Sequence, residues 1–310
     1  MIQMKAPVTI NRATERQKCI WLASYPKSGN TWVRAFLHNL LGVMGGGSEA
    51  PHSINLLQEH TAWELLPRDY DAYLGKPAQD ASAIEIAKAR YAIQEQIAGA
   101  RPQPFLMKTH NAIASVAGSP TINLDVTLAV IYLVRNPLDV AISYSHHSSF
   151  PVDAIIRYMA DEKLATTMTQ LGVYEYLGSW SFHVASWLSV PNRPVHVIRY
   201  EDLLHDSERQ FTGLARFLRL EASTGQICEA NKRSAFEELA RQEAQCGFIE
   251  RPKKAEKFFR SGKAGQWREV LTREQITAIV SAHAPMMQRF GYLPPDCGAD
   301  FRPTAKPLVS

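Results

Sequence analysis

Short apolar runs alternate along the chain with segments whose apolar residues recur at helical spacing. Such runs are typical of buried strands, and the 3.6-residue period is typical of helices covering them. The predicted strands are Cys19 to Ser24, Phe105 to Thr109, Val126 to Val134 and Val195 to Arg199. Four helices are predicted. The first begins near Thr31, the second spans Ala81 to Ala98, the third lies around Glu208 to Leu218, and the last runs from Arg273 to Phe290. This alternation predicts an α/β fold with a central parallel sheet and helices on both faces.

The pattern also predicts where regular structure stops. The glycine-rich stretch Gly42 to Gly47 should end the first helix, and the polar, Lys/Arg-rich stretch Ala240 to Ser261 predicts a mobile loop. A length of 310 residues would allow two domains at about 150 residues each, but the continuous alternation favours one. We expect an N-terminal extension over 1–18, one domain over 19–293 and a Pro-rich tail over 294–310.

Composition limits the classes of protein that the chain can belong to, but it does not indicate a binding partner. The chain is 45% hydrophobic and 21% charged, close to a typical globular protein, which excludes disordered, rod-like and disulfide-dense classes. A net charge of +4 argues against a nucleic-acid-coating protein but does not exclude a local basic pocket. No apolar run approaches the roughly 20 residues of a membrane helix, and no signal-peptide pattern is present, so we expect a cytoplasmic protein.

Cysteine and histidine spacing argues against a metal site. The four cysteines form no CxxC pair, which favours reduced thiols over disulfides or structural zinc. His146 and His147 are adjacent, and neighbouring residues on a helix point in different directions. The sequence therefore predicts chemistry without a metal ion.

Tyr25 to Trp32, between the first strand and the first helix, has the composition of a phosphate-binding turn. Backbone N–H groups and the helix dipole would point at one place there, and Lys27 would add a full positive charge. The alternative is an ordinary βα turn with a solvated lysine. The order Lys27-Ser28-Gly29 and the missing first glycine distinguish the segment from a Walker A loop.

Basic residues follow two other predicted strands, at the sheet edge where ligands bind in open α/β folds. Arg135 has a guanidinium fork that matches phosphate geometry, although it could instead pair with Asp139. His110 is suited to removing a proton near neutral pH, although it could be a structural loop histidine. Lys108 lies on the same side of its strand as His110 by alternation.

Four ordered motifs resemble those of the sulfotransferase family that uses 3'-phosphoadenosine 5'-phosphosulfate (PAPS). The segment 25–32 resembles the family's 5'-phosphosulfate loop, and Lys108-Thr109-His110 resembles its catalytic-histidine strand end. The segment 132–137, with Ser143 beyond it, resembles its 3'-phosphate motif. Residues 259–267 resemble its C-terminal R-K-G-x-x-G-x-W element. The motifs together extend over most of the chain.

Three positions depart from the family's usual residues. Asn30 stands for Thr, Ser261 for Lys and Gln266 for Asp. Asn is also a hydrogen-bond donor and tolerates turns. Lys263 lies two residues beyond Ser261 and could supply the missing charge.

The resemblance implies a P-loop-like, three-layer α/β/α sulfotransferase fold and transfer of a sulfuryl group from PAPS to an acceptor hydroxyl. The catalytic residues it implies are His110 as the base, with Lys27, Lys108 and Ser143. The PAPS-binding residues it implies are Lys27, Ser28, Gly29, Asn30, Thr31, Trp32, Arg135, Ser143, Tyr200, Ser234, Phe236, Arg260, Ser261 and Gly262. It implies no metal ion.

Two alternatives compete with this interpretation: a P-loop kinase-like enzyme that uses ATP, and an inactive protein that binds 3'-phosphoadenosine 5'-phosphate (PAP). The form of the phosphate loop looks more like bacterial members, so we expect a bacterial enzyme acting on a small metabolite or a glycan. The predicted acceptor walls, 44–104 and 150–181, carry aromatic residues but no recognisable signature. The dimerisation segment of many animal members is not recognisable, so the oligomeric state stays open.

Overall fold

The computed structural model describes residues 18–46, 51–101, 103–252 and 254–295. Its main sheet consists of β1 (Cys19–Ser24), β2 (Thr61–Trp63), β3 (Phe105–Thr109), β6 (Thr127–Val134) and β7 (Val195–Arg199). The strand order is β2-β3-β1-β6-β7, and every neighbouring pair is parallel. The predicted parallel sheet is confirmed. The edge strand β2 was not predicted, because three residues are too short to show a strand pattern.

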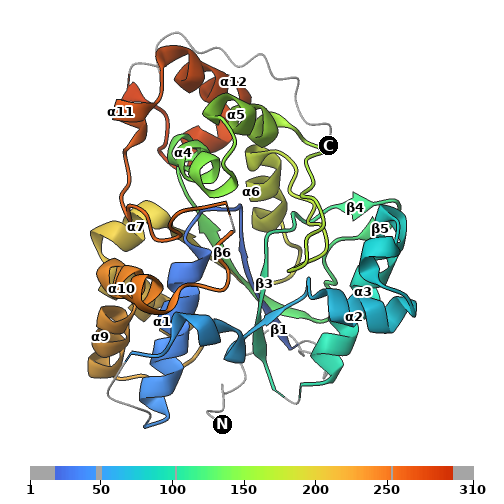
Figure 1. Ribbon diagram of the computed structural model, residues 1–310. Helices are drawn as coiled ribbons and strands as arrows, with labels where there is room; N and C mark the ends of the chain where they lie inside the picture. The colour runs from blue at the N-terminus through green and yellow to red at the C-terminus, as the bar shows by residue number, and fades with distance from the viewer. Residues whose placement is uncertain (1–17, 47–50, 102, 253, 296–310) are drawn as a thin grey trace.

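Helices cover both faces of this sheet, as Figure 1 shows. They are α1 (Asn30–Met44), α2 (Pro67–Leu74), α3 (Ala83–Gly99), α4 (Pro137–Ser148), α5 (Val152–Ala160), α6 (Trp180–Leu188), α7 (Tyr200–His205), α8 (Ser207–Phe217), α9 (Thr224–Arg233), α10 (Phe236–Cys246), α11 (Trp267–Val270) and α12 (Arg273–Arg289). Two 3₁₀ segments, η1 (Ile54–Glu59) and η2 (Ala78–Asp80), and a small hairpin of β4 (Ser115–Val116) and β5 (Ser119–Pro120) complete the described elements.

The sheet separates two hydrophobic cores, which explains its unbroken apolar strands. Alternate side chains of β1 enter opposite cores: Trp21 packs on the α4, α6 and α12 side, and Leu22 on the α1, α8 and α9 side. Every residue of β6 is buried. A strand buried on both faces carries no polar positions, and the predicted three-layer architecture follows from that pattern.

Two sequence predictions about loops were wrong. Gly42 lies inside α1, which continues to Met44, because the apolar face of that helix packs on the sheet and outweighs one glycine. The stretch 240–261 is not all loop: α10 extends to Cys246, with Leu239 buried on one face. Its charged residues form the outer face of an amphipathic helix, and charge alone does not distinguish that face from a loop.

Other boundaries agree with the prediction to within two residues, and Ser82 and Thr272 form the capping boxes that begin α3 and α12. Cys19, Cys228 and Cys246 are free thiols. The predicted extension through residue 17 and the tail from residue 296 lie outside the described residues. Within the described residues, the helices are too short or too polar to cross a membrane.

Candidate active site

The carboxyl ends of β1, β3 and β6 meet at one edge of the sheet, where a cavity of about 640 Å³ opens. Most of the predicted site residues line it: Lys27, Gly29, Asn30, Thr31, Trp32, Lys108, His110, Arg135, Ser143, Tyr200, Phe236, Arg260, Ser261 and Gly262. Ser28 and Ser234 are fully buried and do not line it. The hydroxyl of Ser234 donates to the Asn231 carbonyl 3.1 Å away.

The loop after β1 reverses direction through two left-handed residues, Lys27 with φ of 68° and Gly29 with φ of 102°. A Cβ on Gly29 would lie 2.8 Å from the Tyr200 ring, so glycine is required there by packing as well as by φ. Asn30 begins α1, and its side-chain amide donates to the Leu22 carbonyl at 3.1 Å. Asn30 therefore ties the loop to the end of β1 rather than presenting that amide to the cavity.

The Lys27 ammonium lies in the cavity between aromatic rings. Its Nζ is 3.2 Å from His147 Nδ1 on α4 and 4.2 Å from the centre of the Phe258 ring. Burial, and then the charges of Arg135 and Lys108, lower the pKa of Lys27 to about 7. A lysine in this state gains a proton readily when an anion enters, because the anion compensates the desolvated charge.

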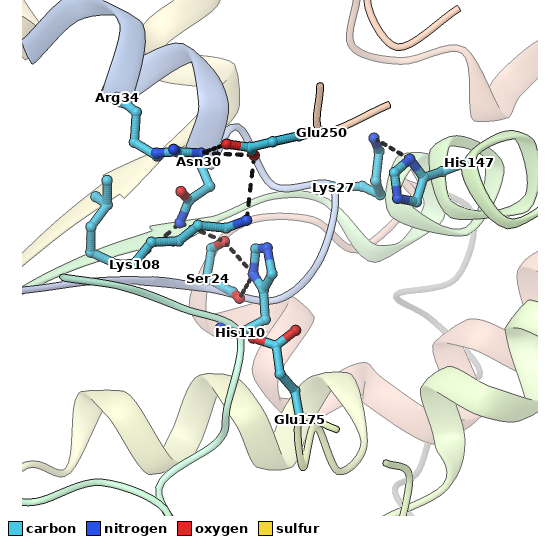
Figure 2. Close-up of polar contacts among 10 residues, drawn as sticks. Ser24, Lys27, Asn30, Arg34, Lys108, His110, His147, Glu175 and Glu250 are labelled. Atoms are coloured by element: carbon cyan, nitrogen blue, oxygen red, sulfur yellow. Dashed lines mark hydrogen bonds and ion pairs between the residues drawn. The ribbon is translucent and has the colours of Figure 1, made fainter. Parts of the chain in front are cut away.

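His110 follows β3 and is held in one tautomer (Figure 2). Its Nδ1 lies 2.7 Å from the Ser24 carbonyl, which can only accept, so Nδ1 carries the hydrogen and Nε2 keeps its lone pair. Burial, together with the positive charge of Lys108, holds the pKa of His110 well below its usual range. The imidazole is therefore neutral at physiological pH and able to accept a proton at Nε2.

Two partly buried carboxylates that the sequence did not single out lie beside these residues (Figure 2). Glu175 accepts the backbone N–H of His110 at 2.8 Å, and burial raises the pKa of Glu175 to about 7. Glu250 lies 3.6 Å from Lys108 Nζ and 2.8 Å from Arg34. Burial opposes the charge of Glu250, but Lys108 and Arg34 outweigh it and keep its pKa below the usual range.

A polar network behind the cavity holds the strand end that carries His110. Glu64, fully buried, accepts hydrogen bonds from Thr109 Oγ1 at 2.6 Å, from Asn111 Nδ2 at 2.9 Å and from Gln94. The Arg90 guanidinium donates to Asn111 Oδ1 at 3.3 Å. The one sequence signal for this network is Glu64 itself, a lone acid among apolar neighbours, because such acids stay buried only when they are paired.

Arg135 joins the two chain segments that enclose the cavity. Its guanidinium donates to the carbonyls of Lys27 and Lys263, each at 3.0 Å, and lies 4.2 Å from the centre of the Tyr200 ring. The alternative pairing with Asp139 is not what the structure shows. Asp139 instead accepts the backbone N–H groups of Gly265 at 2.6 Å and Trp267 at 3.1 Å.

The segment 258–266 crosses the cavity, and we call it the strap. Glu243 on α10 holds one end of the strap by accepting the backbone N–H groups of Phe258 and Phe259 at 2.8 and 2.9 Å. Gln266, where the family usually has Asp, accepts a hydrogen bond from the Arg260 guanidinium at 3.0 Å. Lys263 does not line the cavity with the other cations; its carbonyl faces Arg135.

Aromatic side chains form the wall where the base of a nucleotide could stack. Trp32 and Tyr200 meet edge to face at 6.0 Å between ring centres. Phe236 lies directly against the strap, since a Cβ on Gly262 would be 2.5 Å from its ring. Within the described residues, Ser28 Oγ, Asn30 Oδ1 and Arg135 Nε are buried without hydrogen-bond partners. Of these, Asn30 and Arg135 line the cavity, where a polar ligand could supply the missing partners.

A neutral histidine and converging cations at the carboxyl edge of a parallel sheet fit an enzyme that transfers an anionic group from a nucleotide. The sulfotransferase domain model matches residues 17–291, and the chain belongs to that family. It is a PAPS-dependent sulfotransferase with the P-loop-like α/β fold, as its motifs indicated.

Relatives of established name agree with this assignment. The chain is 25% identical over 272 residues to bovine sulfotransferase 1A1, covering 86% of this chain and 82% of the relative. It is 24% identical to the flavonol 3-sulfotransferase of Flaveria bidentis, covering 84% and 78%. Among solved structures, a mouse sulfotransferase complexed with PAP superimposes with a TM-score of 0.56 at 18% identity, covering 89% and 86%. Retinol dehydratase in a complex with retinol and PAP gives 0.58 at 18%, covering 93% and 83%.

Proposed function

We propose that this sulfotransferase acts on the hydroxyl of a small acceptor and that His110 is the general base. The acceptor O–H gives its proton to His110 Nε2 while its oxygen forms a bond to the sulfur of PAPS. The bond between that sulfur and the bridging oxygen of the 5'-phosphate breaks, and PAP leaves. The tautomer of His110, set by the 2.7 Å contact with the Ser24 carbonyl, carries this proposal.

The cations of the cavity have separable roles in this proposal. Lys27 and Lys108 stabilise the negative charge that develops on the bridging oxygen, because both line the cavity with His110. Arg135, Ser143, Arg260 and the backbone around Gly262 bind the 3'-phosphate, and Trp32, Tyr200 and Phe236 hold the adenine. Ser28 and Ser234 support the loop and the α9 end from outside the cavity.

The acceptor lobe of the cavity favours an alcohol or phenol with an apolar body. Its apolar lining comes from β2, α4, the segment before α6 and the strap, namely Trp63, Leu65, Tyr144, Leu171, Val173 and Phe258. Retinol and androsterone, the compounds bound in two solved retinol dehydratase structures, have such bodies. The same segment before α6 also contributes the polar side chains of Thr166, Thr167, Thr169 and Gln170 to the lining. The bacterial source and the cytoplasmic location stay predictions from the sequence.

Replacing His110 tests the assignment of the base. His110→Ala should lower the rate of sulfuryl transfer by about 100-fold or more, because general-base catalysis typically contributes that much. PAP affinity, measured by calorimetry, should stay nearly unchanged. The exposed His205, replaced by Ala, is the matched control and should keep full turnover. Near-normal turnover of His110→Ala would show that another group removes the proton.

Labelled sulfuryl transfer from PAPS to a panel of phenols, steroids and saccharides tests the acceptor class. Turnover confined to the apolar alcohols and phenols is expected. Turnover confined to saccharides would contradict the proposed acceptor while leaving the role of His110 open to its own test.

A further inference from the structure

A second cluster of titratable side chains lies outside the cavity, between the end of α1 and η1. One nitrogen of His38, one of His60 and a carboxylate oxygen of Glu59 all lie within 4.8 Å of one another. His38 is on α1, and Glu59 and His60 end η1. The three residues are brought together by packing, so sequence spacing could not reveal the cluster.

The two imidazoles face each other at close range. His38 Nδ1 is 2.7 Å from His60 Nδ1, and His38 is 1% exposed. Two nitrogens on one tetrahedral Zn²⁺, each at about 2.0 Å, would lie roughly 3.3 Å apart. A small rotation of the half-exposed His60 ring supplies that difference. In the present contact, the Nδ1 of one neutral imidazole carries a hydrogen and donates it to the Nδ1 of the other. Binding one cation would instead require both Nδ1 atoms to present their lone pairs to it.

A third histidine closes the buried side of the cluster. The His52 ring packs edge to face on His38 with ring centres 5.0 Å apart. Gly42 makes room for it, since a Cβ there would lie 2.0 Å from His52 Nε2. Within the described part of the chain, His38 Nε2 and His52 Nε2 are buried without a hydrogen-bond partner. Two packed imidazoles that each bury an unpartnered nitrogen are a costly arrangement for a purely structural core.

We propose that His38, Glu59 and His60 bind a Zn²⁺ ion, with a water molecule in the fourth position. Two imidazoles and one carboxylate are a donor set that Zn²⁺ accepts in proteins, and imidazole also suits Ni²⁺ and Co²⁺. The exposed side of the cluster, at Glu59, gives the ion an entry path. This site is separate from the sulfuryl-transfer cavity, because none of its three donors lines that cavity.

The position of the site indicates a bracing role. η1 is joined to the region around α10 by hydrogen bonds from Ile54 N to Gln242 Oε1 and from Ile249 N to Asn55 Oδ1, each 2.9 Å long. An ion held by His38, Glu59 and His60 would join η1 to α1. Through the hydrogen bonds of η1, the ion would also brace the segment that carries Glu250, which lies beside Lys108. Zinc would therefore stabilise the folded enzyme without entering the chemistry.

The test is metal binding by the full chain after chelator treatment. Zn²⁺ titration by calorimetry should give one site, and Co²⁺ should give the visible absorption of a tetrahedral complex. His60→Ala and Glu59→Gln should weaken binding, the first by about 100-fold or more, because one of three donors is lost. Zn²⁺ should also raise the thermal midpoint of the parent protein and not that of His60→Ala.

Two control variants make the result decisive. His205→Ala removes an exposed histidine elsewhere and should bind Zn²⁺ as the parent does. His147→Ala removes a cavity histidine, and a loss of zinc there would assign the ion to the cavity and overturn the proposal. Parent-like zinc affinity in His60→Ala, or no zinc uptake by the parent protein at micromolar concentration, would also overturn it. Unchanged PAP affinity in His60→Ala establishes that this variant is folded.

Discussion

At the residue scale, Lys27 connects the folding of the loop after β1 to the binding of the sulfuryl donor, PAPS. Its backbone occupies the left-handed region, which turns the chain so that the side chain enters the cavity. Burial then lowers its pKa to about 7, with smaller contributions from Arg135 and Lys108. The free enzyme therefore holds Lys27 partly neutral near physiological pH, and an anionic nucleotide draws it into the charged form.

This coupling predicts proton uptake when PAP binds. At pH 8 the free Lys27 is mostly neutral, and the bound phosphate raises its pKa, so binding should take up a proton and PAP affinity should fall as pH rises above 7. Calorimetry in buffers of different ionisation enthalpy measures the uptake. Lys27→Met should abolish it, and His147→Ala should retain it. Binding of PAP at pH 8 without proton uptake would contradict the assignment.

At the scale of elements, β2 and β3 show how the strand end that carries His110 is held. Glu64, just after β2, collects donors from β3 and from α3, so three elements converge on one buried carboxylate. Burial raises the pKa of Glu64, while Arg90 and the hydrogen bonds of Thr109, Asn111 and Gln94 oppose that rise. The network places Thr109 and Asn111 on either side of His110 and so sets its approach to the cavity.

Removing this carboxylate should therefore affect both stability and catalysis. Glu64→Ala leaves Arg90 and several donors buried without their partner, which should lower the free energy of unfolding by about 3 kcal/mol. The rate of sulfuryl transfer should fall more than PAP affinity, because Glu64 holds His110 rather than the nucleotide. Denaturant unfolding and steady-state kinetics measure the two effects. Glu208→Ala on the exposed face of α8 is the control, and equal stability of both variants would contradict the network's role.

At the scale of the whole molecule, the cavity is built from parts of the chain that are far apart. The loop after β1 supplies Lys27, the end of β6 supplies Arg135, and the strap supplies Arg260. Arg135 already joins the first and last of these through the carbonyls of Lys27 and Lys263. A nucleotide bound there would contact all three, so its binding free energy adds to the stability of the entire fold.

Thermal unfolding with PAP measures this linkage. At a concentration of 100 times its Kd, PAP should stabilise the parent protein by about 2.7 kcal/mol and raise the unfolding midpoint by several degrees. Arg135→Ala should lose most of this rise at the same concentration, because it removes the guanidinium fork. Arg157→Ala, an exposed position on α5, should keep it. A full rise in Arg135→Ala would place the 3'-phosphate elsewhere.

The sequence by itself determined the class of fold, the order of the motifs and a set of residues most of which line the cavity. These follow from local rules: apolar runs make buried strands, helical spacing makes covering helices, and residues after parallel strands meet at one edge. Gly42 and α10 were misjudged because packing against the sheet, which no local pattern reports, overrides a glycine and a charged stretch.

Tertiary structure decided what each side chain contacts. Asn30 turns toward β1, Asp139 holds the strap, and Glu64 and Glu250 hold the residues around His110 and Lys108. These contacts join residues tens to hundreds of positions apart. The same is true of His38 and His60, which are 22 residues apart in sequence and touch only because η1 packs on α1. Chemistry of this kind depends on distances in space, and a linear pattern carries no record of them.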